Sequence, residues 1–201
     1  MFSRVITYTG AERIGDGVTY LRDHVVPELH QQRGFAGITV SVDRTNKVLG
    51  VLSLWQTAAD REASESGMEK ARAEALRLVG GTLTVEHFEE LYVELVKPPT
   101  PGSALLIRRL RMDPAGIEEN LAYFTQEVVP QLKASPGLLA IRNMVNRTNG
   151  QGLVGTSWAD GPAMEAAAKA ADARRQAAGD RGITFGDQSR REIVLIDLVK
   201  T

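Results

Sequence analysis

Three histidines are the side chains of this chain best suited to proton transfer near neutral pH. His24 and His30 fall in a helical pattern, where a solvated position is the simplest interpretation. His87 directly precedes an apolar strand pattern, so we keep it as a candidate for an acid or base that faces a pocket, with a structural position as the alternative. No histidine is spaced with carboxylates as metal ligands are, so we expect no metal site.

Three arginines interrupt the apolar pattern of a predicted strand near residues 104–112. Alternation along a strand places Arg109 and Arg111 on one face and Arg108 on the other. An unpaired buried charge is costly, so these arginines either form ion pairs across the two halves of the chain or contact an anionic ligand. We keep Arg109 as a pocket candidate. Available acidic partners on the later strands are Glu90, Glu94, Glu192 and Asp197.

Two tryptophans and two tyrosines are the aromatic pocket candidates. Trp55 and Trp158 each close a predicted strand, and Tyr20 and Tyr123 lie at the edge of an apolar helix face. Each has a large apolar body and one polar atom, which suits either a small-molecule pocket or plain core packing. We predict that they line a pocket in each half of the chain.

The chain is built from two copies of one segment. Shifted by 103 residues, the stretch 20–55 aligns without a gap with 123–158, and 13 of the 36 pairs are identical. The stretch KPPTPGS at 97–103 cannot continue a strand or a helix and is interpreted as a linker. We therefore predict a first repeat at 1–97, a linker at 98–103 and a second repeat at 104–201.

Each repeat shows the same order of periodic patterns. A β-branched strand at 2–9 precedes a helix whose apolar residues recur every three or four positions, and Pro27 and Pro130 should bend or interrupt this helix. A hairpin follows, for which Asn149-Gly150 predicts a turn of positive φ. The second helices are expected near 60–79 and 161–178, with Asp160 as a cap, and a last strand closes each repeat.

This β-α-β-β-α-β order, repeated twice, predicts an α+β fold of two ferredoxin-like units. Both helices of a unit cover one sheet face, and the other face would expose a large apolar patch. We expect the two repeats to pack sheet to sheet, as an α+β barrel made within one chain. A monomeric pseudo-dimer or a homo-oligomer of it would result.

Composition limits the class of protein. The net charge is −1, and the charged fraction of 24% shows no basic bias, so we expect neither a nucleic acid nor a membrane as partner. The chain has no cysteine, which excludes disulfides and thiolate chemistry and fits a cytoplasmic location. No phosphate loop, dinucleotide fingerprint or Ser-His-Asp arrangement is visible, and we expect no cofactor.

The segments VVPELHQQRGFAGITVSVDR, LSLWQTAADREASE and LYVELV resemble the antibiotic biosynthesis monooxygenase-like domain of the dimeric α+β barrel superfamily. The resemblance covers nearly the whole chain. It implies a small aromatic ligand and, for some members, cofactor-independent oxygenation of planar aromatic or quinone-like substrates. Trp55 and Trp158 match the tryptophan that closes the third strand in that family and, in haem-degrading members, shapes the pocket.

Haem degradation does not fit this sequence. The haem-degrading members carry a histidine on the second helix and an asparagine on the first strand, and the corresponding segments here have neither. The resemblance therefore leaves two alternatives: an oxygenase without cofactor, or a protein that binds a small molecule or serves only as a structural pseudo-dimer.

Overall fold

The computed structural model describes residues 1–172, 179 and 181–199, and the predicted α+β element order is confirmed in both halves. The elements of the first half are β1 (Phe2–Thr9), α1 (Ile14–Tyr20), η1 (Leu21–Val25), α2 (Val26–His30), β2 (Phe35–Asp43), β3 (Val48–Trp55), α3 (Ala58–Val79) and β4 (Thr82–Leu95). Those of the second half are β5 (Ala104–Arg111), η2 (Pro114–Gly116), α4 (Ile117–Tyr123), η3 (Phe124–Val128), α5 (Val129–Lys133), β6 (Leu138–Val145), β7 (Gln151–Trp158), α6 (Gly161–Asp172) and β8 (Thr184–Leu198).

The chain forms two compact units. Unit 1 comprises Met1–His87 and Glu192–Thr201, and unit 2 comprises Phe88–Arg191. The boundaries fall inside β4 and β8, so each of these long strands contributes one half to each unit. The compact units therefore exchange strand halves relative to the two sequence repeats.

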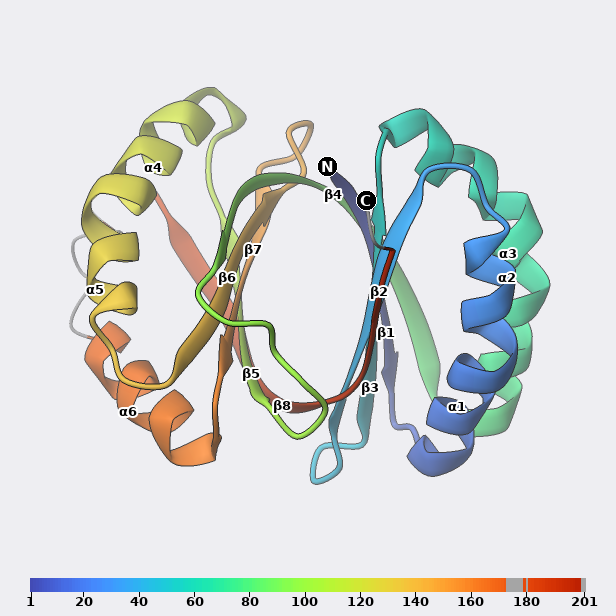
Figure 1. The fold of residues 1–201 in the computed structure, drawn as a ribbon. Coiled ribbons are helices and arrows are strands. Elements are labelled where there is room, and N and C mark those ends of the chain that lie inside the picture. The colour runs from blue at the N-terminus through green and yellow to red at the C-terminus, as the bar shows by residue number, and fades with distance from the viewer. Residues whose placement is uncertain (173–178, 180, 200–201) are drawn as a thin grey trace. The chain divides into compact units, whose positions relative to one another are not determined.

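In unit 1, β1, β3, β2 and the second half of β8 are hydrogen-bonded neighbours in that order, and the pairs β1–β3, β2–β3 and β2–β8 are antiparallel. The first half of β4 lies beside β1, where the hydroxyls of Thr9 and Thr82 are 2.8 Å apart. Unit 2 repeats this order with β8, β5, β7, β6 and the second half of β4. In each unit the helices cover one face of the sheet (Figure 1).

The first helix of each unit is continuous through its proline. The π turn η1 precedes Pro27, and the π turn η3 precedes Pro130. Each proline then stands in the first turn of the next helical segment, α2 or α5. A proline there lacks only a donor that the first turn does not use. The predicted interruption is thus a local change of hydrogen-bond pattern, a single π turn within the helix.

The local signals of the second helices and hairpins are confirmed with one correction. Asp160 Oδ1 accepts from the Ala163 N–H at 2.9 Å and caps α6, whose predicted continuation at 173–178 lies outside the described residues. The hairpin turn between β6 and β7 is present, but only Gly150 has positive φ, at 69°. Asn149 does not, so the turn is not type I′; Asn146 Oδ1 instead accepts backbone N–H groups inside it.

Each unit has its own core between sheet and helices. In unit 1 the core includes Trp55, Ile38 and Leu49, all fully buried. In unit 2 it includes Trp158 and Ile141, also fully buried. Among the described residues no helix is long and apolar enough to cross a membrane.

Candidate functional site

A cavity of about 120 Å³ lies within unit 2, between the sheet and its helices. A cavity needs only about 10–15 Å³ to hold one water, and an engineered cavity of about 150 Å³ binds benzene. The volume of this space, called the unit-2 cavity, is several times that needed for one water and approaches that of the benzene-binding cavity. Its walls come from the strands β4 to β8 and the helical segments α4 to α6.

Most of the cavity wall is apolar or aromatic. Leu106 and Leu110 extend from β5, Phe124 from the π turn η3, and Phe185 from β8. Phe124 packs edge-on against Tyr92, with ring centroids 6.0 Å apart. Such a wall binds flat apolar molecules, because it gains from area burial and from ring contacts.

Trp158, the last residue of β7, lines the cavity. It is 0% exposed, and its Nε1 donates to Thr156 Oγ1 at 2.9 Å. This bond satisfies the indole N–H inside the protein, so the tryptophan offers only its apolar ring to a ligand. The Thr156 hydroxyl retains its own hydrogen for donation.

Asn143 is the polar group that stands out in the cavity. It lies on β6, lines the cavity and is only 9% exposed. Among the described residues its side-chain amide has no hydrogen-bond partner. The amide is accessible from the cavity, so a ligand or a water there can pair with Asn143.

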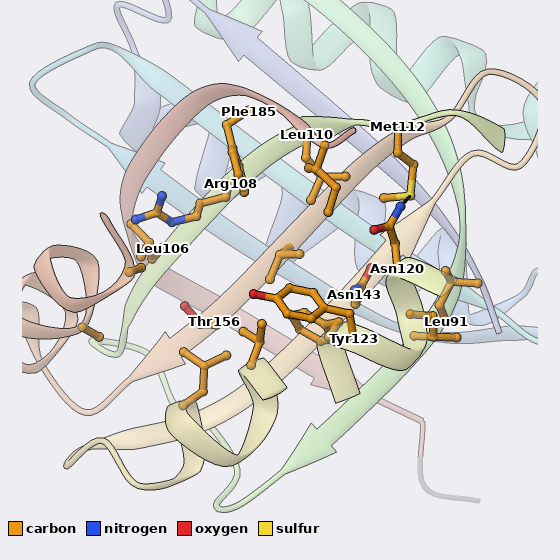
Figure 2. Close-up of a pocket in the computed structure, with 18 of the residues that line it drawn as sticks. Leu91, Leu106, Arg108, Leu110, Met112, Asn120, Tyr123, Asn143, Thr156 and Phe185 are labelled. Atoms are coloured by element: carbon orange, nitrogen blue, oxygen red, sulfur yellow. Dashed lines mark hydrogen bonds between the residues drawn. The ribbon is translucent and has the colours of Figure 1, made fainter. Parts of the chain in front are cut away.

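Arg108, Asn120 and Tyr123 complete the polar part of the wall. Arg108 Nη2 donates to the Ala168 carbonyl at 3.3 Å, which holds its guanidinium on the α6 side. Tyr123 comes from α4, and the Arg181 guanidinium lies 4.4 Å from the centre of its ring. In Figure 2 the side chains of Arg108 and Asn120 stand on opposite sides of Tyr123.

Unit 1 has a cavity at the equivalent place, and it is largely filled. This unit-1 cavity measures about 30 Å³. Phe2 of β1 and Ala104 of β5 both stand opposite the closing tryptophan, so the first strands correspond with a shift of 102 residues. The unit-1 counterparts of Leu106 and Leu110 are then Arg4 and Tyr8. The second helices keep the shift of 103, as their capping residues Thr57 and Asp160 show, so the counterpart of Ala171 is Met68. All three unit-1 residues are larger and occupy most of the space.

The same shift changes which residues of the first repeat correspond to the arginines of β5. The offset of 103 found in the central part of the repeats places Arg108 opposite Val5 in the other copy, and this is wrong for the first strands. Arg108 corresponds to Ile6, because the connection before α4 is one residue longer than that before α1. The sequence pattern could not show this, since the two connections differ in length and the gapless alignment of the repeats begins only after them, at Tyr20 and Tyr123.

The structure divides the six candidate pocket residues. Tyr123 and Trp158 line the unit-2 cavity. Arg109 is not among the lining residues, because alternation turns it to the sheet face opposite Arg108. The expected acidic partners Glu90, Glu94 and Asp197 lie against Arg142, Lys133 and His30.

The three candidates of unit 1 are not among the residues that line the unit-1 cavity. Trp55 is fully buried, packs edge-on against Phe35 at 5.6 Å and donates to Ser53 Oγ at 3.1 Å. Tyr20 is half-buried, with its ring 5.2 Å from that of His24. His87 belongs to an ion network, described next.

The ion network of unit 1 is centred on Glu65 of α3. Its Oε1 lies 2.8 Å from Arg4 and 2.9 Å from His87 Nε2, and its Oε2 lies 2.9 Å from Arg72. Burial opposes ionisation of Glu65, but Arg4 and Arg72 hold its pKa below the usual value. Burial and the charge of Arg61 lower the pKa of His87, although Glu65 acts in the opposite direction.

Sequence reasoning missed Asn143 and Arg108 as cavity residues. Asn143 replaces Val40 of the other copy at the same sheet position. A polar residue in place of a buried apolar one between two copies is a usable signal, and an alignment of the repeats contains it. Among the described residues no cluster of three or more His, Asp or Glu residues could hold a metal ion.

No family model matches the chain. An uncharacterised protein of Mycobacterium tuberculosis is 25% identical over 155 residues, which cover 77% of this chain and 69% of that protein. A second uncharacterised protein of the same organism is 25% identical over 130 residues, or 65% of this chain and 55% of that protein.

Several solved structures share the fold. An anthrone oxidase-like protein matches with a TM-score of 0.71 at 13% identity, covering 98% of this chain and 92% of that one. A monooxygenase-like protein from Listeria innocua matches with a TM-score of 0.55 at 11% identity, covering 96% and 94%. A ferredoxin-fold protein from Listeria monocytogenes, related to antibiotic biosynthesis monooxygenases, matches with a TM-score of 0.53 at 10% identity, covering 96% and 95%. The chain therefore has the α+β fold of the proteins related to antibiotic biosynthesis monooxygenases.

Proposed function

We propose that the unit-2 cavity binds one planar aromatic or quinone-like molecule and that the chain oxygenates it with O₂ and without a cofactor. The observation that carries the proposal is the contrast between the two units. Unit 2 keeps an aromatic-walled cavity with the unpaired amide of Asn143, whereas Arg4, Tyr8 and Met68 fill the counterpart in unit 1.

The polar groups of the cavity suit a phenol or quinone oxygen. The Asn143 amide and the Thr156 hydroxyl can each donate to such an oxygen, while the rings of Trp158 and Phe124 contact the flat body. The positive charge of Arg108 favours a phenolate, which is the electron-rich form that reacts with O₂. In the proposed reaction the substrate loses two hydrogens and gains one oxygen atom, and the second oxygen atom leaves as water.

A second function, binding without catalysis, is favoured by the chemistry of the wall. Among the described residues that line the cavity there is no His, Asp, Glu or Lys to act as a general base. An oxygenase would then rely on Arg108 to favour the phenolate, or on a water molecule to accept the phenol proton. The two functions share the site and differ only in turnover.

Fluorescence of the two tryptophans tests the binding step, since the chain has no others. Trp55→Phe leaves Trp158 at the unit-2 cavity as the only tryptophan, and Trp158→Phe leaves Trp55. We expect 1,4-naphthoquinone to quench Trp55→Phe protein saturably and Trp158→Phe protein only weakly. Equal, unsaturable quenching of both variants would contradict binding in this cavity.

Oxygen uptake then separates the enzyme from the binder. 1-Naphthol plus O₂ gives 1,4-naphthoquinone plus water, so an oxygen electrode and quinone absorbance report the same reaction. We expect uptake with the wild-type protein and at least a tenfold loss in Asn143→Leu protein, in line with about 1.4 kcal/mol per tenfold. Saturable binding without uptake would support the non-catalytic function instead.

A further inference from the structure

The unit-1 cavity has a cationic side. Arg4 and Arg72 both line it, from β1 and α3. Arg4 is 1% exposed and is held by Glu65 at 2.8 Å and by the Ser64 hydroxyl, to which it donates at 2.9 Å. Its unit-2 counterpart is the apolar Leu106, so this charge is peculiar to unit 1.

Two guanidinium groups share a single carboxylate at this cavity. Arg72 Nη2 lies 2.9 Å from Glu65 Oε2, while Arg4 uses the other oxygen of the same group. Arg72 Nη1 is buried and has no hydrogen-bond partner. The pair of arginines therefore leaves one positive charge and one donor unmatched beside the cavity, which is costly in a desolvated place.

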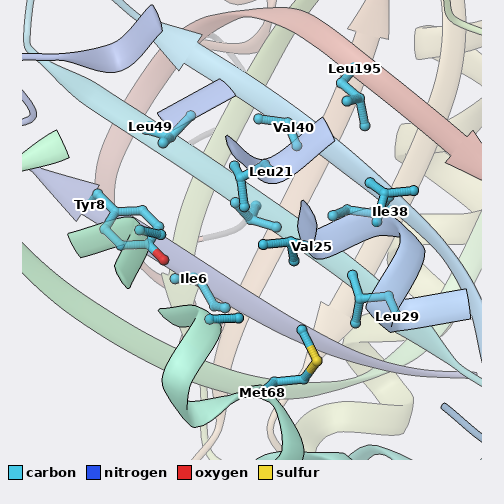
Figure 3. Close-up of a cluster of buried hydrophobic side chains, with 14 of the residues drawn as sticks. Ile6, Tyr8, Leu21, Val25, Leu29, Ile38, Val40, Leu49, Met68 and Leu195 are labelled. Carbon is cyan, nitrogen blue, oxygen red and sulfur yellow. The ribbon is translucent and has the colours of Figure 1, made fainter. Parts of the chain in front are cut away.

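Tyr8 supplies a second polar group without a partner. Its side chain is 1% exposed, lines the same cavity and has no hydrogen bond among the described residues. Figure 3 shows the Tyr8 hydroxyl pointing inward, toward the apolar cluster around Ile6 and Val25. Burial raises the pKa of Tyr8 to about 12, although the charge of Arg72 acts against the rise, so the hydroxyl keeps its proton and can donate it.

We propose that the unit-1 cavity binds a small monovalent inorganic anion, such as chloride or nitrate, through Arg72 Nη1 and the Tyr8 hydroxyl. An anion supplies the acceptor that both donors lack and balances the surplus charge, whereas water supplies only the acceptor. The volume of about 30 Å³ exceeds the roughly 10–15 Å³ that one water needs and suits an ion of this size. The unit-1 cavity would thus be an ion site, independent of the aromatic site proposed for unit 2.

Thermal unfolding at constant ionic strength tests the proposal in solution. Sodium chloride or sodium nitrate replaces sodium gluconate, whose anion is too large for the cavity. At an anion concentration of ten times Kd, we expect Tm to rise by about 3–6 °C. Equal Tm values in all three salts would overturn the proposal.

Variants locate the effect. Tyr8→Phe keeps the ring and removes one donor, so we expect about a tenfold weaker anion response. Arg72→Met keeps the side-chain stem and removes the charge and the free donor, and should abolish the response. Arg77→Met is the control, because Arg77 lies on the same helix but is 68% exposed and paired with Glu74, and it should respond as the wild type does. A wild-type response in both Tyr8→Phe and Arg72→Met would overturn the proposal.

Crystals of the wild-type protein grown in sodium bromide make the test independent of variant folding. Bromide scatters anomalously, and we expect a peak inside the unit-1 cavity within hydrogen-bond distance of Arg72 Nη1. A cavity that holds only water under these conditions would overturn the proposal.

Discussion

Single residues give the two cavities different chemistry. At equivalent sheet positions unit 1 has Val40, fully buried in the core, and unit 2 has Asn143, whose amide lines the cavity. A core valine needs no partner, whereas a buried amide does. The Asn143 side chain lines the cavity, so the ligand proposed for this cavity can pair with its amide.

His87 gives a prediction at the residue scale, on pH. Burial, together with Arg61, lowers the pKa of His87 in the folded protein, although Glu65 opposes this. The unfolded chain has a histidine pKa of about 6.5, so protonation favours the unfolded state. Stability that is present above about pH 6.5 is therefore lost as pH falls toward the folded pKa.

We accordingly expect wild-type Tm to fall more than that of His87→Gln protein between about pH 7.5 and about pH 5.5. Carboxylates titrate mostly below this window, near pH 4, and contribute little to the difference. His24→Gln is the control, since His24 is exposed on η1 and its removal should leave the wild-type pH profile unchanged. A steeper fall in His87→Gln than in the wild type would contradict the assigned sign.

At the scale of elements, periodicity predicted most of the fold. The apolar spacing placed both first helices, and the cap Asp160 and the hairpin turn near Gly150 were found from local residue types. These features depend on neighbours in sequence. The residue-by-residue correspondence between β5 and β1 was not found. One extra residue in the connection that follows β5 moves every side chain of that strand by one position relative to the alignment of the repeats. That shift is why Arg108, and not Arg109, lines the cavity.

The helix α6 offers the sharpest test of the open cavity. Ala171 lines the unit-2 cavity where α3 has Met68 in unit 1. We expect Ala171→Met to fill the space, to abolish saturable quenching of Trp158 and to change the free energy of unfolding by less than about 1.5 kcal/mol. Ala170→Met is the matched control, because Ala170 is exposed on the same helix. Undiminished binding in Ala171→Met protein would place the ligand elsewhere.

At the scale of the whole molecule, the exchange of strand halves makes each unit depend on both repeats. In unit 1, Ile38 and Val40 of β2 pair with Asp197 and Leu195 of β8. In unit 2, β6 pairs with the second half of β4, for example Ile141 with Glu94. The two repeats are visible in the sequence, but strand pairing across the linker is a long-range choice that residue types alone do not specify.

This exchange predicts how the chain behaves when it is divided in the linker. The fragment 1–103 lacks the strand that covers β2, and the fragment 104–201 lacks the strand that covers β6, so each has an unpaired sheet edge. We expect each fragment alone to be unfolded or self-associated, and an equimolar mixture to form a 1:1 complex with the circular dichroism spectrum of the intact chain. Light scattering coupled to size exclusion measures both outcomes. A folded, monomeric 1–103 fragment would contradict the dependence of unit 1 on β8, because a stable β2 edge would then need no partner from the second repeat.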